Sequence, residues 1–169
     1  ETVRDAADAV ANALDELAAG HARDGRDHYY RVRDSAFNPL REAGRRTDGR
    51  IAYTPELAAM LIYLNRTGFN GLFRVNAGGA FNVPAGRYER PRIADRARLL
   101  QVSDALRNPR VRIEWGSFER AGEIANTGDF LYIDPPYAPL SRTASFTGYT
   151  TQKFDASGQR HLQQLVVSL

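Results

Sequence analysis

The chain has 169 residues, of which 43% are hydrophobic, and this suffices for one packed domain or for a core with an insertion. It contains no cysteine and no apolar run of the ~18 residues that a membrane span requires, which excludes a disulfide scaffold and predicts a cytoplasmic protein with no membrane partner. The formal net charge of +3 comes almost entirely from arginine, since Lys153 is the only lysine, and the three histidines are too scattered to predict a metal site.

The arginines gather in two stretches of the chain. One group lies between Arg41 and Arg50, and the other lies between Arg87 and Arg98. Clusters of this kind favour a partner with a phosphate backbone, such as double-stranded DNA. A GC-rich coding sequence would give the same arginine bias, so charge alone does not select between the two explanations.

Helical periodicity marks the first part of the chain. Residues 2–19 carry apolar side chains at the spacing of one helical face, and Gly20 predicts the end of that helix. We expect a polar loop at 21–27, a short helix with packing aromatic residues at 28–37, and a charged loop at 38–53.

A second helix has a clear start signal. Thr54 is a cap residue, Pro55 suits the first helical position, and the helix should extend to about Arg66. The glycine- and asparagine-rich segment that follows interleaves aromatic and arginine residues, and we expect a β-hairpin there, at about 66–90. We interpret residues 1–92 as a mainly helical target-recognition region that carries this hairpin.

The remaining residues, 93–169, alternate between helix and strand patterns. Helices are expected at 93–106, 117–125 and 155–169. RVRIEW at 110–115 alternates apolar and charged residues, and FLYI at 130–133 is apolar like a strand in the middle of a parallel sheet. We therefore predict an α/β fold, a partial Rossmann-like sheet preceded by the helical insertion.

The sequence FLYIDPPYAPLS at 130–141 places an acid and two prolines directly after an apolar segment. A residue before proline is held extended, and each proline fixes its own φ and lacks an N–H. Asp134 and the Pro135 carbonyl thus form a stiff tip with two hydrogen-bond acceptors and no donor. This tip could hold both hydrogens of an adenine amino group and direct the nitrogen lone pair at an electrophilic methyl, while Tyr137 stacks on the base. A base inside a duplex must be flipped out to reach such a tip.

The alternative is a proline-rich turn in which Asp134 caps a helix. Four specified residues in this order match by chance in a chain of this length with a frequency on the order of one in a thousand. The interpretation as a binding tip for an amino group is therefore favoured.

Two segments resemble a known family. NRTGFNGLFRVNAGGAFNVPAGRY at 65–88 and DPPYAPLSRTASFTGYT at 134–150 resemble the signature regions of the Dam-type, or D12 class, DNA adenine-N6 methyltransferases, and their order also agrees. The resemblance implies methyl transfer from S-adenosyl-L-methionine to N6 of a flipped adenine in double-stranded DNA, in a GATC-like site and without a metal. It allows a restriction-modification system with a cognate endonuclease, or a regulatory or phage role.

The resemblance also assigns roles by position. Asp134, Pro135, Pro136 and Tyr137 would hold the adenine, with Asp134 also near the methyl donor. Ser117 and Phe118 would contact the adenine of the donor, although Ser117 departs from the acidic residue frequent there. Phe69 would wedge into the base stack. The remaining DNA contacts would be Asn70, Leu72, Arg74 and Pro84 at base edges, and Arg66, Asn82, Arg87, Tyr88 and Ser141 along the backbone.

The family's glycine-rich cofactor motif, F-x-G-x-G, does not occur ahead of the first helix. We therefore expect a fragment of such an enzyme, which alone binds the cofactor weakly and is inactive. Two other functions stay open. The first is transfer to cytosine N4 or to a base in RNA, because the tip at Asp134 fits any exocyclic amine. The second is a DNA-binding module without catalysis.

Overall fold

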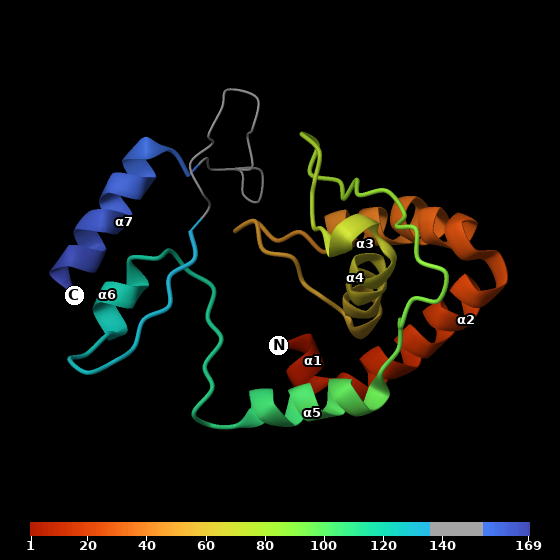
Figure 1. Ribbon diagram of the computed structural model, residues 1–169, viewed down its shortest axis with the longest axis horizontal. Coiled ribbons are helices and arrows are strands. Elements are labelled where there is room, and N and C mark those ends of the chain that lie inside the picture. Colours follow the sequence, from red (N-terminus) through yellow and green to blue (C-terminus); the bar gives the residue numbers. More distant parts are fainter. Residues whose placement is uncertain (136–153) are drawn as a thin grey trace. The chain divides into compact units, whose positions relative to one another are not determined.

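Helices make up the regular structure of the described part of this protein. The computed structural model describes residues 1–135 and 154–169, which form two units, Glu1–Ile113 and Glu114–Leu169. The first unit contains α1 (Thr2–Asp5), α2 (Ala7–Arg31), the π-helix η1 (Val32–Phe37), α3 (Asn38–Ala43), α4 (Pro55–Thr67), the 3-10 turn η2 (Phe69–Gly71) and α5 (Arg96–Arg107). The second unit contains α6 (Arg120–Ile124) and α7 (Ala156–Ser168) (Figure 1).

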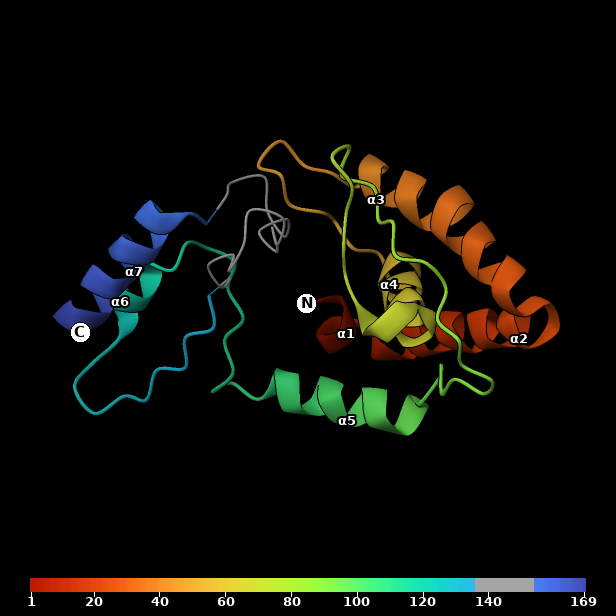
Figure 2. The ribbon, with the colours of Figure 1, turned by 45° about the horizontal axis from the view of Figure 1, so that its top comes forward.

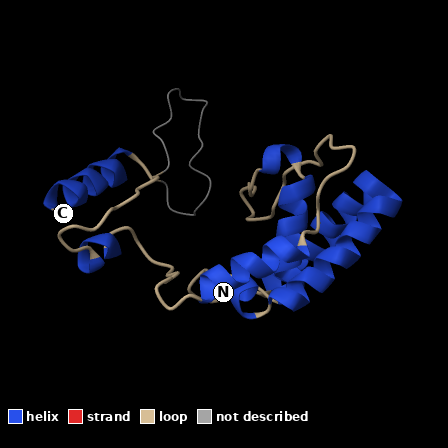
Figure 3. Ribbon diagram, turned by 60° about the horizontal axis from the view of Figure 1, so that its bottom comes forward, coloured by secondary structure: helices blue, strands red, loops and turns tan. Residues whose placement is uncertain are grey.

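The predicted α/β fold, a partial Rossmann-like sheet, is wrong. Figure 3 shows helices and loops, and no strand, in the part of the chain that the structure describes. Residues 110–115 and 130–133, predicted as strands, are irregular, and Phe130 keeps 89% of its surface exposed. A strand needs a neighbour that takes up its backbone N–H and C=O groups, and neither segment forms such a ladder with another described residue.

The β-hairpin predicted at about 66–90 is likewise wrong as a pair of strands. The chain does turn back on itself there, but its antiparallel pairing is limited to isolated bridges, between Gly68 and Ala85 and between Val75 and Phe81. Several backbone groups between residues 79 and 85 bond instead to side chains of the preceding helices. Those side chains occupy the edge at which a further strand would pair.

α2 is longer than the helix predicted at 2–19, and it is bent. It runs through the predicted loop at 21–27, where Gly25 leaves helical geometry with a φ of 51° and a ψ of −119°. Residues with a side chain rarely adopt this conformation, so glycine allows two helical limbs to join at an angle (Figure 2). Leu14 of the first limb and Tyr29 of the second are both buried in the core.

α4 packs against α2 and supplies the centre of the core. Its predicted start is confirmed, because the Thr54 hydroxyl accepts a hydrogen bond from the Leu57 N–H at 3.2 Å and Pro55 opens the first turn. Leu57, Tyr63 and Leu64 are almost completely buried. Burial of each leucine side chain contributes about 1.5–3 kcal/mol to the free energy of unfolding.

α5 packs against α1, at the start of the chain. It begins at Arg96 rather than at the predicted residue 93, because the Asp95 carboxylate caps its first turn. Ser103 Oγ and Arg107 Nε both donate to the Arg4 carbonyl, at 2.9 Å and 2.8 Å. These bonds satisfy a carbonyl at the end of α1 that the short helix cannot satisfy itself.

The second unit has its own helix start. Asp155 Oδ1 accepts the N–H groups of Gly158 and Ser157, at 3.1 Å and 2.9 Å, and these bonds hold the pKa of the carboxyl below its usual range. A charged cap at the positive end of a helix favours α7 in its own right. No helix among the described residues of either unit is both long enough and apolar enough to cross a membrane.

Candidate nucleic-acid interface

Residues 67–86, here called the paired loop, form two limbs that run in opposite directions. At the base of the loop, the Phe69 N–H donates to the Pro84 carbonyl at 2.9 Å. Nearer its tip, the Asn82 N–H donates to the Arg74 carbonyl at 3.1 Å. These four residues are all predicted DNA contacts. The backbone bonds therefore pair Phe69 with Pro84 and Arg74 with Asn82 across the loop.

Arg74 and Asn82 are also bonded through their side chains. Arg74 Nε donates to Asn82 Oδ1 at 2.8 Å, and Arg74 Nη2 lies 3.4 Å from the Asn82 carbonyl oxygen. Because the Asn82 amide oxygen accepts from Arg74, its NH₂ group is the part that can still donate to the DNA backbone, the contact predicted for Asn82. The guanidinium is held in one orientation, so the two residues would meet DNA as a unit.

The base of the paired loop presents an exposed aromatic ring. Phe69 keeps 48% of its surface exposed, as its predicted wedging role requires. Asn70 next to it has a left-handed φ of 52°, which asparagine tolerates better than most residues. Leu72 is half-buried and packs against the hydrophobic core, so part of its side chain has a structural role.

A cavity of about 730 Å³ lies beside the base of the paired loop. Its lining includes four predicted DNA contacts and further basic residues: Arg66, Asn70, Arg87, Tyr88, Arg90 and Arg92. Glu89 is the one acidic residue among the described residues that line it. A basic wall with a half-exposed aromatic ring suits a phosphate backbone and an unstacked base.

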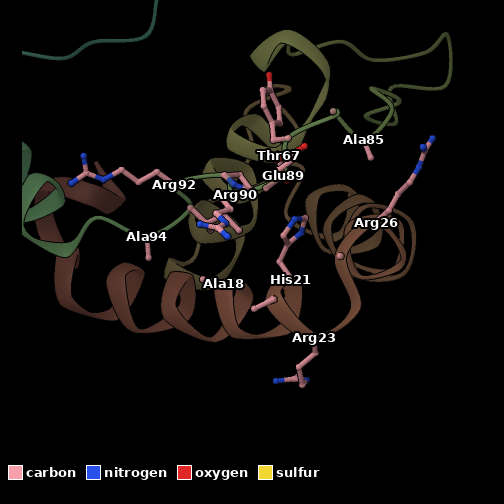
Figure 4. A pocket seen from close by; sticks show the side chains of 16 residues that line it. Ala18, His21, Arg23, Arg26, Thr67, Ala85, Glu89, Arg90, Arg92 and Ala94 are labelled. Carbon is pink, nitrogen blue, oxygen red and sulfur yellow. The ribbon is translucent and has the colours of Figure 1, made fainter.

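A second cavity, also of about 730 Å³, lies between the bend of α2 and residues 85–94. Figure 4 shows His21 and Arg90 projecting toward the same space, whereas Arg23 points away on the other side of α2. Residues 88–92 line both cavities. The positive charge here is therefore spread along a wall and does not converge on one point.

The residues predicted to act on the adenine belong to the second unit. Asp134 is exposed and Pro135 is half-buried. Pro136, Tyr137 and Ser141 lie outside the described residues. What Asp134 and Pro135 offer chemically is a carboxylate and an adjacent carbonyl, both hydrogen-bond acceptors.

The predicted cofactor contacts lie in the same unit. Ser117 is exposed, and Phe118 is half-buried with its ring centroid 6.1 Å from that of Phe154 and 5.3 Å from that of His161. Both neighbours meet Phe118 edge-to-face, with interplanar angles of 84° and 71°, so the three rings form an aromatic cluster. Within residues 1–135 and 154–169, no group of three or more His, Asp or Glu side chains could hold a metal ion.

Sequence reasoning missed the side chains that hold the paired loop from outside. Asn38, in a segment predicted as loop, donates to and accepts from the backbone of Phe81, and Arg33 donates to the Val83 carbonyl. The partners are 43 and 50 residues apart, so no local pattern signals these contacts.

Comparison with known proteins adds independent information. The sequence model of the D12 class N6 adenine-specific DNA methyltransferase family matches residues 1–169. The chain is 42% identical over 152 residues to the Type II methyltransferase M1.LlaDCHI of Lactococcus lactis subsp. cremoris, covering 89% of this chain and 50% of that protein. It is 39% identical over 153 residues to the Type II methyltransferase M.MjaIII of Methanocaldococcus jannaschii, covering 90% and 49%. It is 38% identical over 141 residues to the DNA adenine methylase of Escherichia coli K12, covering 83% and 45%. The chain thus spans about half the length of these curated relatives.

Proposed function

The chain belongs to the D12 class N6 adenine-specific DNA methyltransferase family, and from this premise we propose that the full-length protein methylates N6 of adenine in double-stranded DNA, with S-adenosyl-L-methionine as donor. The observation that carries the proposal is the acid–proline–proline–tyrosine sequence that starts at Asp134, within a match to the family that covers every residue of the chain. That sequence is the part of the chain whose chemistry suits an amino group.

Asp134 and Pro135 act on the target nitrogen. The carboxylate and the neighbouring carbonyl accept the two amino hydrogens of the adenine, which withdraws the nitrogen lone pair from the ring and fixes its direction. Tyr137 stacks on the flipped base, and Pro136 keeps the segment stiff. S-adenosyl-L-methionine, when bound, supplies a methyl group on a positively charged sulfur.

Residues of the second unit would bind the cofactor. Phe118, which packs edge-to-face with Phe154 and His161, would contact the adenine of the cofactor. The exposed Ser117 hydroxyl can donate or accept a hydrogen bond at the edge of that ring. Asp134 would lie near the methyl group of the bound cofactor.

The two regions of the chain have different roles. Residues 1–92 recognise DNA and residues 93–169 belong to the catalytic region. Arg74 pairs with guanine, Asn70 pairs with an adenine edge, and Leu72 and Pro84 contact thymine methyl groups, a set of residue types that suits a GATC-like sequence. The arginine-bearing walls beside the paired loop bind the phosphate backbone. A restriction system would add a cognate endonuclease as a functional partner.

The test uses the full-length protein and its Asp134→Asn variant. Each is expressed in a host that lacks adenine methylation, and the DNA is read by GATC-cutting nucleases sensitive to methylation and by sequencing that detects N6-methyladenine. The wild type should methylate adenine at one short sequence. Asp134→Asn should lower the transfer rate by about 100-fold or more while DNA affinity stays unchanged, because an amide places a donor against the amino hydrogens.

Asp104→Asn is the matched control. Asp104 is an exposed aspartate of α5 outside the predicted site, and its variant should methylate at the wild-type rate. Methylation of cytosine N4 or of RNA would replace the proposal with transfer to another amine. Sequence-specific DNA binding by the full-length protein without any transfer would identify a binding module and would overturn the proposal.

A further inference from the structure

One edge of the paired loop is held by side chains. Between residues 79 and 85, each odd-numbered residue bonds through its backbone to a side chain that lies between residues 29 and 41. The bonds join Arg41 Nη1 to the Gly79 carbonyl (2.5 Å), Asn38 Nδ2 to the Phe81 carbonyl (3.0 Å), the Phe81 N–H to Asn38 Oδ1 (2.8 Å), Tyr29 OH and Arg33 Nη1 to the Val83 carbonyl (2.9 Å each), and the Ala85 N–H to Tyr30 OH (3.4 Å). We call these five side chains the side-chain ladder.

The other edge of the same segment pairs with the first limb of the loop. Beyond the turn, residues 80, 82 and 84 make these bonds, which join Asn76 N–H to the Ala80 carbonyl (2.9 Å), Asn82 N–H to the Arg74 carbonyl (3.1 Å) and Phe69 N–H to the Pro84 carbonyl (2.9 Å). At the turn itself, the Gly79 N–H donates to the Asn76 carbonyl (2.9 Å). Alternation of bonding direction with a period of two is the property of an extended backbone. The segment therefore lies between two partners, one a backbone and the other a set of helical side chains.

The π-helix aligns the members of the ladder. Tyr29 and Arg33 are four residues apart and share one face of the helix. Asn38 follows Arg33 by five residues, a step that would carry it off this face in an α-helix. Because η1 (Val32–Phe37) has i to i+5 hydrogen bonding, five residues complete about one turn there, and Asn38 returns to the face of Arg33.

We propose that the side-chain ladder is a positioning device for sequence recognition, and that Asn38 is its principal residue. Asn82 and Pro84, two predicted DNA contacts, occupy the even positions between the ladder's attachment points at residues 81, 83 and 85. The bonds made by residues 81, 83 and 85 fix the backbone on either side of Asn82 and Pro84, and so they set the direction in which these two side chains point. This inference rests on the proposed function, since it concerns how the same protein discriminates between DNA sequences.

A single substitution removes all the ladder bonds of Phe81 but only one of the two ladder bonds of Val83. Asn38 satisfies both backbone groups of Phe81, and Phe81 is itself buried against Phe37 with ring centroids 5.7 Å apart. Removal of the Asn38 amide leaves a buried N–H and C=O without a partner. The Val83 carbonyl has two donors, so loss of either one leaves the other in place. Tyr29→Phe and Arg33→Gln should therefore be mild alone and severe together.

The experiment measures discrimination in the full-length protein. Methylated sites in DNA from cells that express the wild type define the target, and affinity is then measured for that duplex and for one with a single changed base pair. Asn38→Ala and the double variant Tyr29→Phe/Arg33→Gln should each reduce the ratio of the two affinities by about tenfold or more, with affinity for the changed duplex unaltered. Each single change at Tyr29 or Arg33 should reduce it less than threefold.

Arg31→Gln is the matched control, because Arg31 lies on the same helical stretch and its guanidinium pairs with Asp24 at the surface, away from the backbone of residues 79–85. It should keep the wild-type ratio. Should Asn38→Ala fail to fold, the double variant decides. The inference is overturned if the folded variants keep the wild-type ratio, or if they lose affinity for both duplexes equally, as a general loss of structure would produce.

A separate readout distinguishes this inference from the proposed function. If the wild-type protein neither binds nor methylates DNA, the proposed function fails and recognition by the ladder fails with it. The positioning itself is then judged by hydrogen exchange at the Phe81 amide. Exchange at that amide should accelerate in Asn38→Ala and not in Arg31→Gln, and equal rates in the two variants would reject the ladder as a positioning device.

Discussion

Tyr63 contacts two histidines, His21 before the bend in α2 and His28 after it. His21 Nδ1 lies 2.8 Å from the Tyr63 hydroxyl, and the His28 ring packs edge-on at 5.6 Å between centroids. Burial raises the pKa of Tyr63 to about 12 and lowers the pKa of both imidazoles. For His28, the nearby Arg31 guanidinium lowers the pKa further, and Asp24 opposes this. Both histidines are half-buried beside the core, and this burial favours their neutral forms.

These lowered pKa values predict that acid destabilises the protein. The unfolded chain has ordinary histidines with a pKa of 6.5, whereas the folded protein takes up their protons only at lower pH. Below pH 6.5 the unfolded state therefore binds more protons, and the free energy of unfolding should fall as pH falls until the folded-state pKa values are passed. The slope contributed by each histidine is at most about 1.4 kcal/mol per pH unit.

Urea titrations between pH 7.5 and pH 5 would measure this slope. His28→Gln should flatten the dependence on pH, whatever its effect on stability at pH 7.5. Equal slopes in the wild type and the His28 variant would show that His28 contributes nothing to the acid sensitivity.

At the scale of the element, the bend of α2 depends on one glycine. Gly25 has a φ of 51°, and a Cβ placed there would meet no atom within 4 Å. Gly25→Ala should therefore destabilise the protein only through the strained backbone conformation of residue 25. We expect this substitution to lower the free energy of unfolding by about 1–3 kcal/mol. Thermal or urea unfolding followed by circular dichroism measures it.

Gly78→Ala provides the comparison for that prediction. Gly78 is exposed, its φ is not in the left-handed region, and a Cβ there would have only Asn76 Oδ1 nearby, at 3.4 Å. The change should alter the free energy of unfolding by less than about 0.5 kcal/mol. Similar losses for the two glycine variants would contradict the assignment of the bend to Gly25.

Elements with local signals could be predicted, and elements that depend on distant partners could not. Thr54 and Pro55 predicted the start of α4 because capping involves only neighbouring residues. The polar residues 21–27 predicted a loop, but a solvent-exposed bend within a helix has the same composition. Alternation at 110–115 predicted a strand, yet alternation favours an extended backbone only when another strand pairs with it.

The same distinction applies to the candidate site. The family resemblance predicted DNA contacts at Asn70 and at Arg66, Arg87 and Tyr88, and the structure places all four around one cavity. Their roles on DNA stay predictions. Asn38 could not have been selected, because its role follows from a contact across 43 residues and from a π-helical turn that no composition signals.

At the scale of the whole molecule, the two units differ in how much apolar surface each buries. In the described part of the chain, the buried apolar residues all belong to Glu1–Ile113 except Leu162. The second unit instead exposes large apolar side chains, among them Phe130 and Tyr132. Since burial of apolar surface is the main source of stability, the first unit should unfold cooperatively and the second should contribute little to that transition.

The single tryptophan reports on this difference in the 169-residue chain. Trp115 belongs to the second unit and keeps 72% of its surface exposed. Its emission should already resemble that of tryptophan in water, with ready quenching by acrylamide, and should shift little during a urea titration. Circular dichroism should meanwhile show a cooperative loss of helix, mainly from α2 and α4, so the two probes should not trace one curve. Blue-shifted emission that moves to the red at the same urea midpoint as the circular dichroism signal would mean that Trp115 is buried in a unit as stable as the first.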